Sequence, residues 1–205
     1  MAEGNDELKR TYRAKSRDMS EVALGIEENS MKIIESEIGI HGYTKAQWNI
    51  VRRVIHATAD FDFAKPDKNG IIFSTSAIEN AFGAFKQRHH IVVDVDMVLS
   101  GINKKSVAKI GTNLICNISN KDVVEISKNQ NKTRSTVAMR YSSKEIDGGI
   151  VVIGIPVGFV SASESKLELS KANVAFITNI GRKGGSPAAS SIINALMLMY
   201  INNLN

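Results

Sequence analysis

The spacing of apolar residues predicts alternating helices and strands along most of this 205-residue chain. Helical spacing over residues 20–38 predicts one or two helices, and Thr44 with Gln47 forms a capping box that starts the next one. Beyond residue 60, short apolar runs alternate with stretches at helical spacing. The strand-like runs are 61–64, 91–94, 114–118, 150–153 and 174–178, and the helix-like stretches are 76–85, 122–128, 164–172 and 186 onwards. Such alternation is typical of an α/β fold in which helices cover both faces of a parallel sheet.

The two ends of the chain differ in character. Residues 1–18 are polar and are predicted to form an N-terminal extension, which leaves 19–205 as a single α/β domain. The last helix is apolar around most of its circumference. A position in the core and a position at a subunit interface both explain that pattern.

Composition narrows the range of partners. The net charge is +5, but the cations are spread along the chain and aromatic residues make up only 6%, which argues against nucleic-acid binding. Cys116 is the only cysteine, so an intrachain disulfide is excluded and a reducing, cytoplasmic setting is expected. The longest apolar stretch, 150–160, is interrupted by Gly154, Pro156 and Gly158 and is too short to span a bilayer. The sequence therefore predicts a cytoplasmic protein that binds neither nucleic acid nor membrane.

Two glycine-rich segments near the C-terminal end give the strongest functional signal. Residues 154–166 read G-I-P-V-G-F-V-S-A-S-E-S-K and residues 181–186 read G-R-K-G-G-S, each after a strand-like run. Open α/β folds bind ligands in loops at the carboxyl ends of their strands. Glycines let backbone N–H groups approach an acceptor, while Lys166, Arg182 and Lys183 supply charged donors for carboxylate or phosphate. The expected ligand is a small polyanion.

His56 and two aspartates lie where the second helix leads into a strand-like run. An imidazole at this point can donate or accept a proton near neutral pH, although a helix-terminal histidine more often serves packing. Asp60 and Asp62 alternate with phenylalanines, so both carboxylates are expected on one face of a strand. That arrangement suggests a sheet edge or the rim of an active site.

Further polar residues lie at predicted element boundaries. Arg134 lies in K-T-R-S at a helix start, where first-turn N–H groups and the guanidinium suit a carboxylate; simple N-capping by a neighbouring hydroxyl is the alternative. Asp94 and Asp96 form a D-x-D pair that would suit Mg²⁺, but the pair is weak evidence without a P-loop or a further acidic ligand. The motifs G-x-x-x-x-G-K-[ST], G-x-S-x-G and H-E-x-x-H are absent. Nucleotide hydrolysis, esterase and metalloprotease chemistry are therefore unsupported.

The combination of P-V-G-F-V-S-A-S-E-S-K, G-R-K-G-G-S and N-A-L resembles the precorrin-8X methylmutase family. Similar segments occur along most of the chain, among them V-I-H-A-T-A-D-F at 54–61, D-V-D-M-V-L-S-G-I at 94–102 and T-R-S-T-V-A-M-R at 133–140. The resemblance implies a three-layer flavodoxin-like fold, a homodimer and a place in cobalamin (corrin) biosynthesis. The implied reaction is an intramolecular methyl migration from C11 to C12 of precorrin-8 or cobalt-precorrin-8. It implies no cofactor, since any cobalt is already held by the tetrapyrrole substrate.

The same resemblance assigns roles to individual residues. His56, in V-I-H-A, is the catalytic candidate, acting as a general acid toward the macrocycle. The remaining candidates would bind the peripheral carboxylates of the substrate. They are Ser30, Arg134, Lys166, Arg182, Lys183 and Ser186.

The chain departs from the family pattern at one point. In the family, the strand that corresponds to G-I-V-V-I-G is followed by an N-A-P-T-A-L segment, a helix and another strand before P-V-G-F-V. Here Ile153 and Gly154 lead directly into Ile155 and Pro156, so a whole βα unit is missing. Three hypotheses follow: a tetrapyrrole isomerase, a non-catalytic tetrapyrrole-binding relative without a complete pocket, and an unrelated phosphate or nucleotide binder. The retained His56 favours the first, and the missing unit favours the second.

Overall fold

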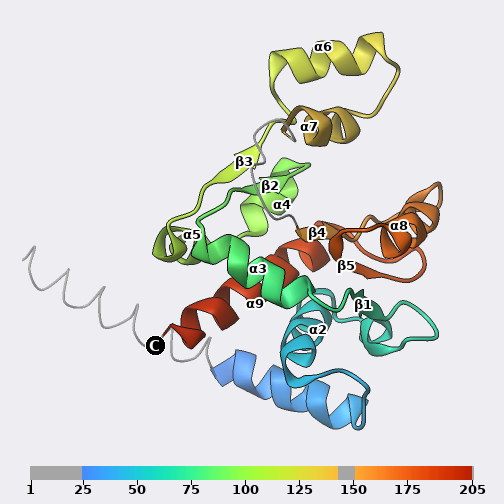
Figure 1. Ribbon diagram of the computed structural model, residues 1–205. Coiled ribbons are helices and arrows are strands. Elements are labelled where there is room, and N and C mark those ends of the chain that lie inside the picture. The colour runs from blue at the N-terminus through green and yellow to red at the C-terminus, as the bar shows by residue number, and fades with distance from the viewer. Residues whose placement is uncertain (1–24, 143–150, 205) are drawn as a thin grey trace, which may run out of the picture. The chain divides into compact units, whose positions relative to one another are not determined.

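The computed structural model describes residues 25–142 and 151–204, which group into two compact units (Figure 1). The first unit ends at His41, and residues 25–38 of its described part form a helix. The second unit begins at Gly42 and holds every strand of the described chain. The labelled helices and strands described below belong to this second unit.

Five short strands form two separate sheets. In one sheet the order is β1 (Ile71–Phe73), β5 (Ala175–Asn179), β4 (Val151–Gly154); in the other, β2 (Ile91–Val93) pairs with β3 (Leu114–Cys116). The pairs β4–β5 and β2–β3 are parallel, as the α/β pattern predicts, whereas β1 runs antiparallel to β5. The described strands thus form a mixed arrangement in two pieces rather than one continuous parallel sheet.

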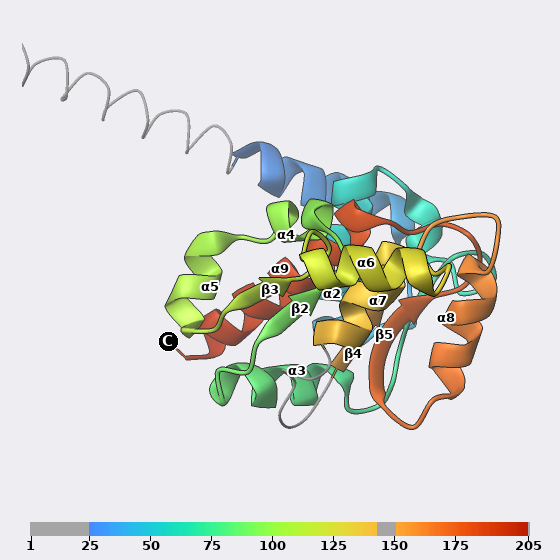
Figure 2. The same cartoon turned by 90° about the horizontal axis from the view of Figure 1, so that it is seen from above.

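Helices connect and cover these strands. They are α2 (Lys45–Thr58), α3 (Ala77–Lys86), α4 (Asp96–Gly101), α5 (Lys104–Ile110), α6 (Lys121–Asn129), α7 (Arg134–Ser142), α8 (Ala162–Lys171) and α9 (Ser186–Asn203). Helix α9 contacts α2, α3, α4 and α5, while α7 contacts β2 and β3, and α8 contacts β5 (Figure 2). None of the helices in residues 25–142 and 151–204 is long and apolar enough to cross a membrane.

The core forms around α9 and α2. Ile192, Leu196 and Met197 of α9 are almost completely buried, as are Val51 and Val54 of α2. These buried residues assign α9 to the core of the second unit, one of the two positions that its apolar circumference allows. The predicted capping box of α2 is present, because the Thr44 hydroxyl and the Gln47 side chain each bond the other residue's backbone N–H.

The structure corrects one predicted strand. Residues Phe61–Ala64 form a short 3₁₀ helix, η1, because Asp60 Oδ1 accepts the N–H of Asp62 at 3.0 Å and starts a turn. An aspartate that bonds the backbone two residues ahead competes with extended structure. The alternation of aspartates and phenylalanines therefore does not mark a strand.

Candidate active site

The two glycine-rich segments lie against each other at the carboxyl ends of β4 and β5. The N–H of Gly185 donates to the carbonyl of Ile155 at 2.7 Å, and the N–H of Gly158 donates to the carbonyl of Arg182 at 3.1 Å. Gly184 has φ = 155°, and a Cβ there would overlap the carbonyl oxygen of Ile155. The glycines thus serve close backbone approach between the two loops, which the sequence predicted for approach to a ligand.

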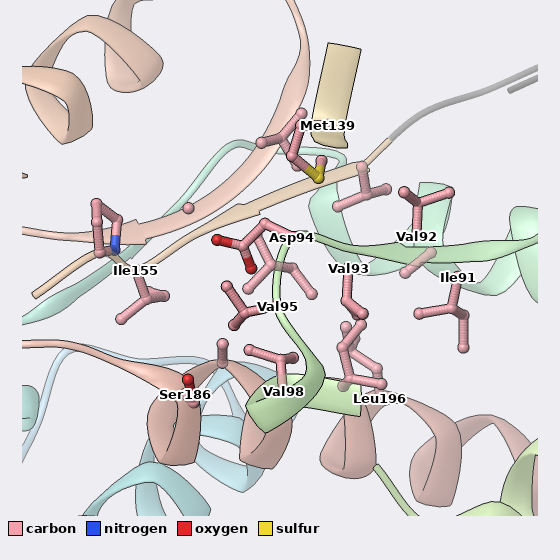
Figure 3. A pocket seen from close by; sticks show the side chains of 18 of the residues that line it. Ile91, Val92, Val93, Asp94, Val95, Val98, Met139, Ile155, Ser186 and Leu196 are labelled. Carbon is pink, nitrogen blue, oxygen red and sulfur yellow. The ribbon is translucent and has the colours of Figure 1, made fainter. Parts of the chain in front are cut away.

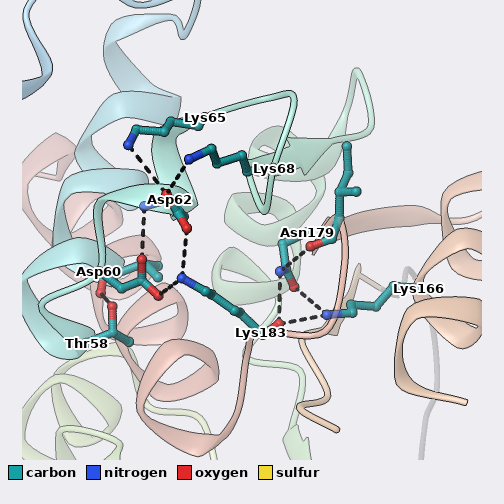
Figure 4. A network of polar contacts seen from close by, with 10 residues as sticks. Thr58, Asp60, Asp62, Lys65, Lys68, Lys166, Asn179 and Lys183 are labelled. Carbon is teal, nitrogen blue, oxygen red and sulfur yellow. Dashed lines mark hydrogen bonds and ion pairs between the residues drawn. The ribbon is translucent and has the colours of Figure 1, made fainter. Parts of the chain in front are cut away.

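Lys166 is buried and supports the glycine-rich loop at residues 181–186 through hydrogen bonds (Figure 4). Its residue is only 2% exposed, and its Nζ donates to Asn179 Oδ1 at 3.1 Å and to the carbonyl of Lys183 at 2.7 Å. Burial lowers the pKa of the Lys166 ammonium to about 8. The amide of Asn179 also donates to the carbonyl of Lys183, so one backbone oxygen is held from two sides. Asn179 has no motif that would have identified it from sequence.

Lys183 is paired with two aspartates. Its Nζ lies 2.7 Å from Asp60 Oδ2 and 2.8 Å from Asp62 Oδ2, so both carboxylates converge on one ammonium group (Figure 4). The hydrogen bond from Lys183 holds the pKa of Asp62 below its usual range, and the bond to Asp60, followed by that to Asp62, raises the pKa of Lys183. The sequence predicted that the two carboxylates share one face of a strand and that Lys183 is a charged donor for a ligand. The structure brings them into one cluster, in which the carboxylates balance the lysine.

Arg182 and Ser186 are more open. Arg182 is exposed, and its guanidinium lies 5.5 Å from the centre of the Phe159 ring, where the cation and the ring face attract each other. Ser186 is the first residue of α9, so its neighbourhood combines a hydroxyl with the N–H groups of a helix start. Both residues suit contact with an anionic group.

His56 lies in the last turn of α2 and is exposed. Its imidazole makes no hydrogen bond or ion pair to other residues of the described chain. Ala57, the next residue, lines a cavity of about 370 Å³ together with Ser186 and Asn194. His56 is not among the residues that line this cavity, but helix α2, which carries it, packs against α9.

Ser30 and Arg134 have only local hydrogen-bonding surroundings in the described residues. Ser30 belongs to the helix of the first unit, where its hydroxyl donates to the carbonyl of Ile26 at 2.8 Å. Arg134 opens α7 and is exposed, and Thr133 Oγ1 accepts the N–H of Thr136 at 3.3 Å, as the N-capping alternative predicts. No hydrogen bond or ion pair within the described chain joins either residue to the two glycine loops.

The surroundings of Asp94, Asp96 and Cys116 do not support a metal site or a reactive thiol. Among residues 25–142 and 151–204, no group of histidine, cysteine and acidic side chains is arranged to hold a metal ion, so Asp94 and Asp96 do not form such a site. Burial is the main cause that raises the pKa of the Cys116 thiol, and this does not favour a nucleophilic thiolate. Asp94 instead lies at the end of a cavity of about 850 Å³ between β2 and β4 (Figure 3). The sequence predicted that a βα unit is missing beside β4, but it did not predict a cavity at that position.

The site and the fold together match one family of α/β isomerases. The family model for precorrin-8X methylmutase matches residues 25–155 and 150–199. The cobalt-precorrin-8 methylmutase of Priestia megaterium is 40% identical over 199 positions, which cover 85% of this chain and 87% of that protein. The cobalt-precorrin-8 methylmutase of Leptospira interrogans is 34% identical over 216 positions, covering 89% and 96% of the two chains.

A solved structure agrees with these sequence matches. The crystal structure of precorrin-8X methylmutase from Thermus thermophilus superposes with a TM-score of 0.77 at 31% identity, covering 87% of this chain and 97% of that one. This chain belongs to the precorrin-8X methylmutase family.

The comparisons also locate the departure from the family. The two matched stretches overlap at residues 150–155, so the segment that contains β4 aligns with two places in the family model. In the alignment with the Priestia protein, 85% of 205 residues is about 174, so about 25 of the 199 positions have no residue of this chain opposite them. The double match at residues 150–155 and the number of unmatched positions both agree with a missing βα unit beside β4.

Proposed function

We propose that this chain is an isomerase of cobalamin (corrin) biosynthesis that converts precorrin-8 or cobalt-precorrin-8 to hydrogenobyrinate or cobyrinate. The reaction moves a methyl group from C11 to C12 within the macrocycle. The observation that carries the proposal is the family match on both sides of β4, together with relatives 34% and 40% identical that are named cobalt-precorrin-8 methylmutase. The two glycine loops and His56 supply the chemistry that such a substrate requires.

His56 is the proposed general acid. Its imidazole, at the exposed end of α2, makes no hydrogen bond to other described residues, and the next residue, Ala57, lines the cavity of about 370 Å³ that Ser186 also lines. A proton or hydrogen bond given to a ring nitrogen draws electron density from the conjugated macrocycle and eases the methyl shift, after which the proton returns to the imidazole. Because the methyl group stays on the same molecule, the step needs no external donor or acceptor.

The cationic candidates divide into two roles. Arg182, Arg134 and the Ser186 hydroxyl would contact substrate carboxylates directly, because the two guanidinium groups are exposed and no carboxylate of the described residues neutralises them. Lys166 and Lys183 are candidates for the same carboxylates. Their ammonium groups already bond protein oxygens, so their first effect is to fix the loop that presents Arg182. Ser30, in the helix of the first unit, stays a candidate for contact with a substrate carboxylate.

The two sheets are the remaining parts of one flavodoxin-like sheet. If one parallel strand is restored between β2 and β4, the parallel strands follow the order β3, β2, restored strand, β4, β5. Numbered along the chain, that order is 2-1-3-4-5, the flavodoxin-like order. Met139 of α7 and Leu196 of α9 lie on opposite sides of this position, which supports three layers (Figure 3). Residues 19–205 would then form one family domain.

A homodimer completes the proposal. Val157, Phe159 and Val160, in the loop that follows β4, are 64%, 85% and 87% exposed. Large apolar side chains exposed together on one loop favour burial against a partner, and a second copy of this chain would cover them. Replacement of Phe159 with serine should shift the oligomer toward monomer in sedimentation measurements, whereas an unchanged distribution would refute this interface.

An absorbance titration with hydrogenobyrinic acid, the expected product, tests the site. The wild type should change the corrin spectrum at stoichiometric protein, and His56→Ala should weaken that change. His90→Ala is the matched control, because His90 precedes β2 at the end of that strand remote from Asp94. If neither the wild type nor His90→Ala changes the corrin spectrum, the proposed binding site would be overturned.

The missing unit supports a second candidate function, a tetrapyrrole-binding relative without turnover. The cavity of about 850 Å³ between β2 and β4 is the observation in its favour, since it leaves one wall of the fold open. This candidate predicts the same spectral change on binding but no conversion of precorrin-8.

A further inference from the structure

The free edges of β2 and β4 face each other across the larger cavity. Every residue of Ile91–Val93 and of Val151–Gly154 lines it, whereas no residue of β3 or β5 does. β3 and β5 occupy the other edges of these two strands. Within the described chain, the cavity therefore lies along two strand edges that have no ladder partner, and such edges are templates for pairing with another strand.

The two edges run in the same direction. β2 ends at Val93, next to Asp94, and β4 leads into Ile155; Figure 3 shows Asp94 and Ile155 on the side of the cavity near Ser186. The N–H of Gly185, which precedes Ser186, donates to the carbonyl of Ile155 at 2.7 Å. Both strands thus point toward the N-terminal end of α9. A strand placed between them in the family's direction would pair in parallel on both sides.

The volume suits one short strand. In a packed sheet a strand residue rises about 3.3 Å, lies about 4.8 Å from its neighbour and fills a layer about 10 Å thick, which is roughly 160 Å³. The cavity of about 850 Å³ therefore has room for roughly five residues. That is the length of β5, the longest strand of the described chain.

The lining restricts the chemistry of the occupant. Val98 and Leu196 bound the cavity on one side and Met139 on the other (Figure 3), with further apolar side chains from α8 and α9, Leu169 and Ile193. Arg88, Asp94 and Lys166 also line the cavity, but Arg88 and Asp94 lie before and after β2, and Lys166 already bonds Asn179 and the Lys183 carbonyl. Alternate side chains of an inserted strand would point to the two apolar sides, where a charged side chain would lose its hydration without gaining a partner. The slot therefore suits a strand that is apolar on both faces, as strands inside parallel sheets are.

We propose that this slot is a docking site for one strand of a second polypeptide, about five residues long, apolar on both faces and parallel to β2 and β4. The overlap of the family matches at residues 150–155 supports an external source, because it indicates that one strand position lacks its own segment in this chain. Backbone hydrogen bonds on two edges would give affinity, and the apolar walls would give selectivity. The inference rests on the two strand edges and the cavity, not on the proposed reaction.

A fluorescein-labelled peptide, K-K-G-I-V-V-I-G-K-K, tests this docking site. Its centre copies the β4 segment, which aligns with two strand positions of the family, and its lysines keep it soluble. It should bind the intact protein saturably at one peptide per chain in fluorescence anisotropy. Hydrogen exchange of the β2 and β4 amides should slow at least tenfold on binding, while that of β1 stays unchanged.

Two controls make the test decisive. The peptide K-K-G-I-P-V-I-G-K-K, which lacks one ladder N–H, should bind at least tenfold more weakly to the same wild-type protein. Ala189→Phe, which places a ring in the slot from α9, should weaken binding of the first peptide by a similar factor. Equal binding of the two peptides, binding without protection of β2 and β4, or absence of binding would overturn the proposal. Protection of both strands through self-association, without peptide binding, would also overturn it, because a second copy would then be the occupant.

Discussion

Lys166 allows a quantitative prediction about the loop it supports. Its ammonium is buried and has a pKa near 8, against 10.5 for an ordinary lysine. Between these values the unfolded chain binds more protons than the folded one, so the free energy of unfolding rises with pH in this window. With these two pKa values, the contribution of Lys166 rises by about 2 kcal/mol between pH 7 and pH 9.5.

A Lys166→Met variant removes this contribution and keeps the length of the side chain. Urea unfolding of both proteins can be followed by the fluorescence of Trp48, the only tryptophan, which is buried in α2. The stability of the wild type minus that of Lys166→Met should rise by about 2 kcal/mol from pH 7 to pH 9.5. Taking this difference cancels titrating groups common to both proteins, including Tyr43, whose pKa burial raises to about 12.

The pH dependence separates this explanation from simple loss of hydrogen bonds. Removing the bonds to Asn179 Oδ1 and the Lys183 carbonyl alone would lower stability by a similar amount at every pH. A difference that stays constant within about 0.5 kcal/mol over this range would refute a buried ammonium with a depressed pKa.

Three further predictions concern local structure and can be measured by urea unfolding. Thr44→Ala breaks the capping box of α2 and should cost about 1 kcal/mol; an unchanged midpoint would contradict the cap. Val123→Ala should cost about 2 kcal/mol, because Val123 is fully buried where α6 packs on α7, and Val124→Ala, half-buried beside it, should cost less. Gly184→Ala should cost about 2 kcal/mol and weaken hydrogenobyrinic acid binding, because its Cβ would meet the Ile155 carbonyl; wild-type stability and binding would exclude close packing of the two loops.

Local signals in the sequence predicted most elements of the fold. The capping box at Thr44 marked the start of α2, and runs of β-branched residues marked β2, β4 and β5. These signals work because capping and alternation act over a few neighbouring residues. β1 was not predicted, although it is as long as β2 and β3; it lies antiparallel to β5, which an alternating pattern of parallel strands and helices does not anticipate. The strand predicted at 61–64 was wrong because the side chain of Asp60 bonds the backbone and starts a turn.

The candidate site was less predictable because its contacts join distant parts of the chain. The sequence identified Lys166 and Lys183 as cations but not their partners, which come from β5 and from the segment after α2. Whether a lysine faces solvent or a buried amide depends on packing that no local pattern records. Residues 150–155 match the family model at two positions, but this double match does not indicate that a cavity remains beside β4.

Turnover of cobalt-precorrin-8 tests the central claim most directly. With substrate and protein alone, the wild type should convert the starting spectrum to that of cobyrinate, and His56→Ala should slow conversion by about 10² to 10⁴-fold while His90→Ala matches the wild type. Binding of the corrin without any conversion by the wild type, or equal rates for the wild type and His56→Ala, would contradict an isomerase that uses His56 as its acid.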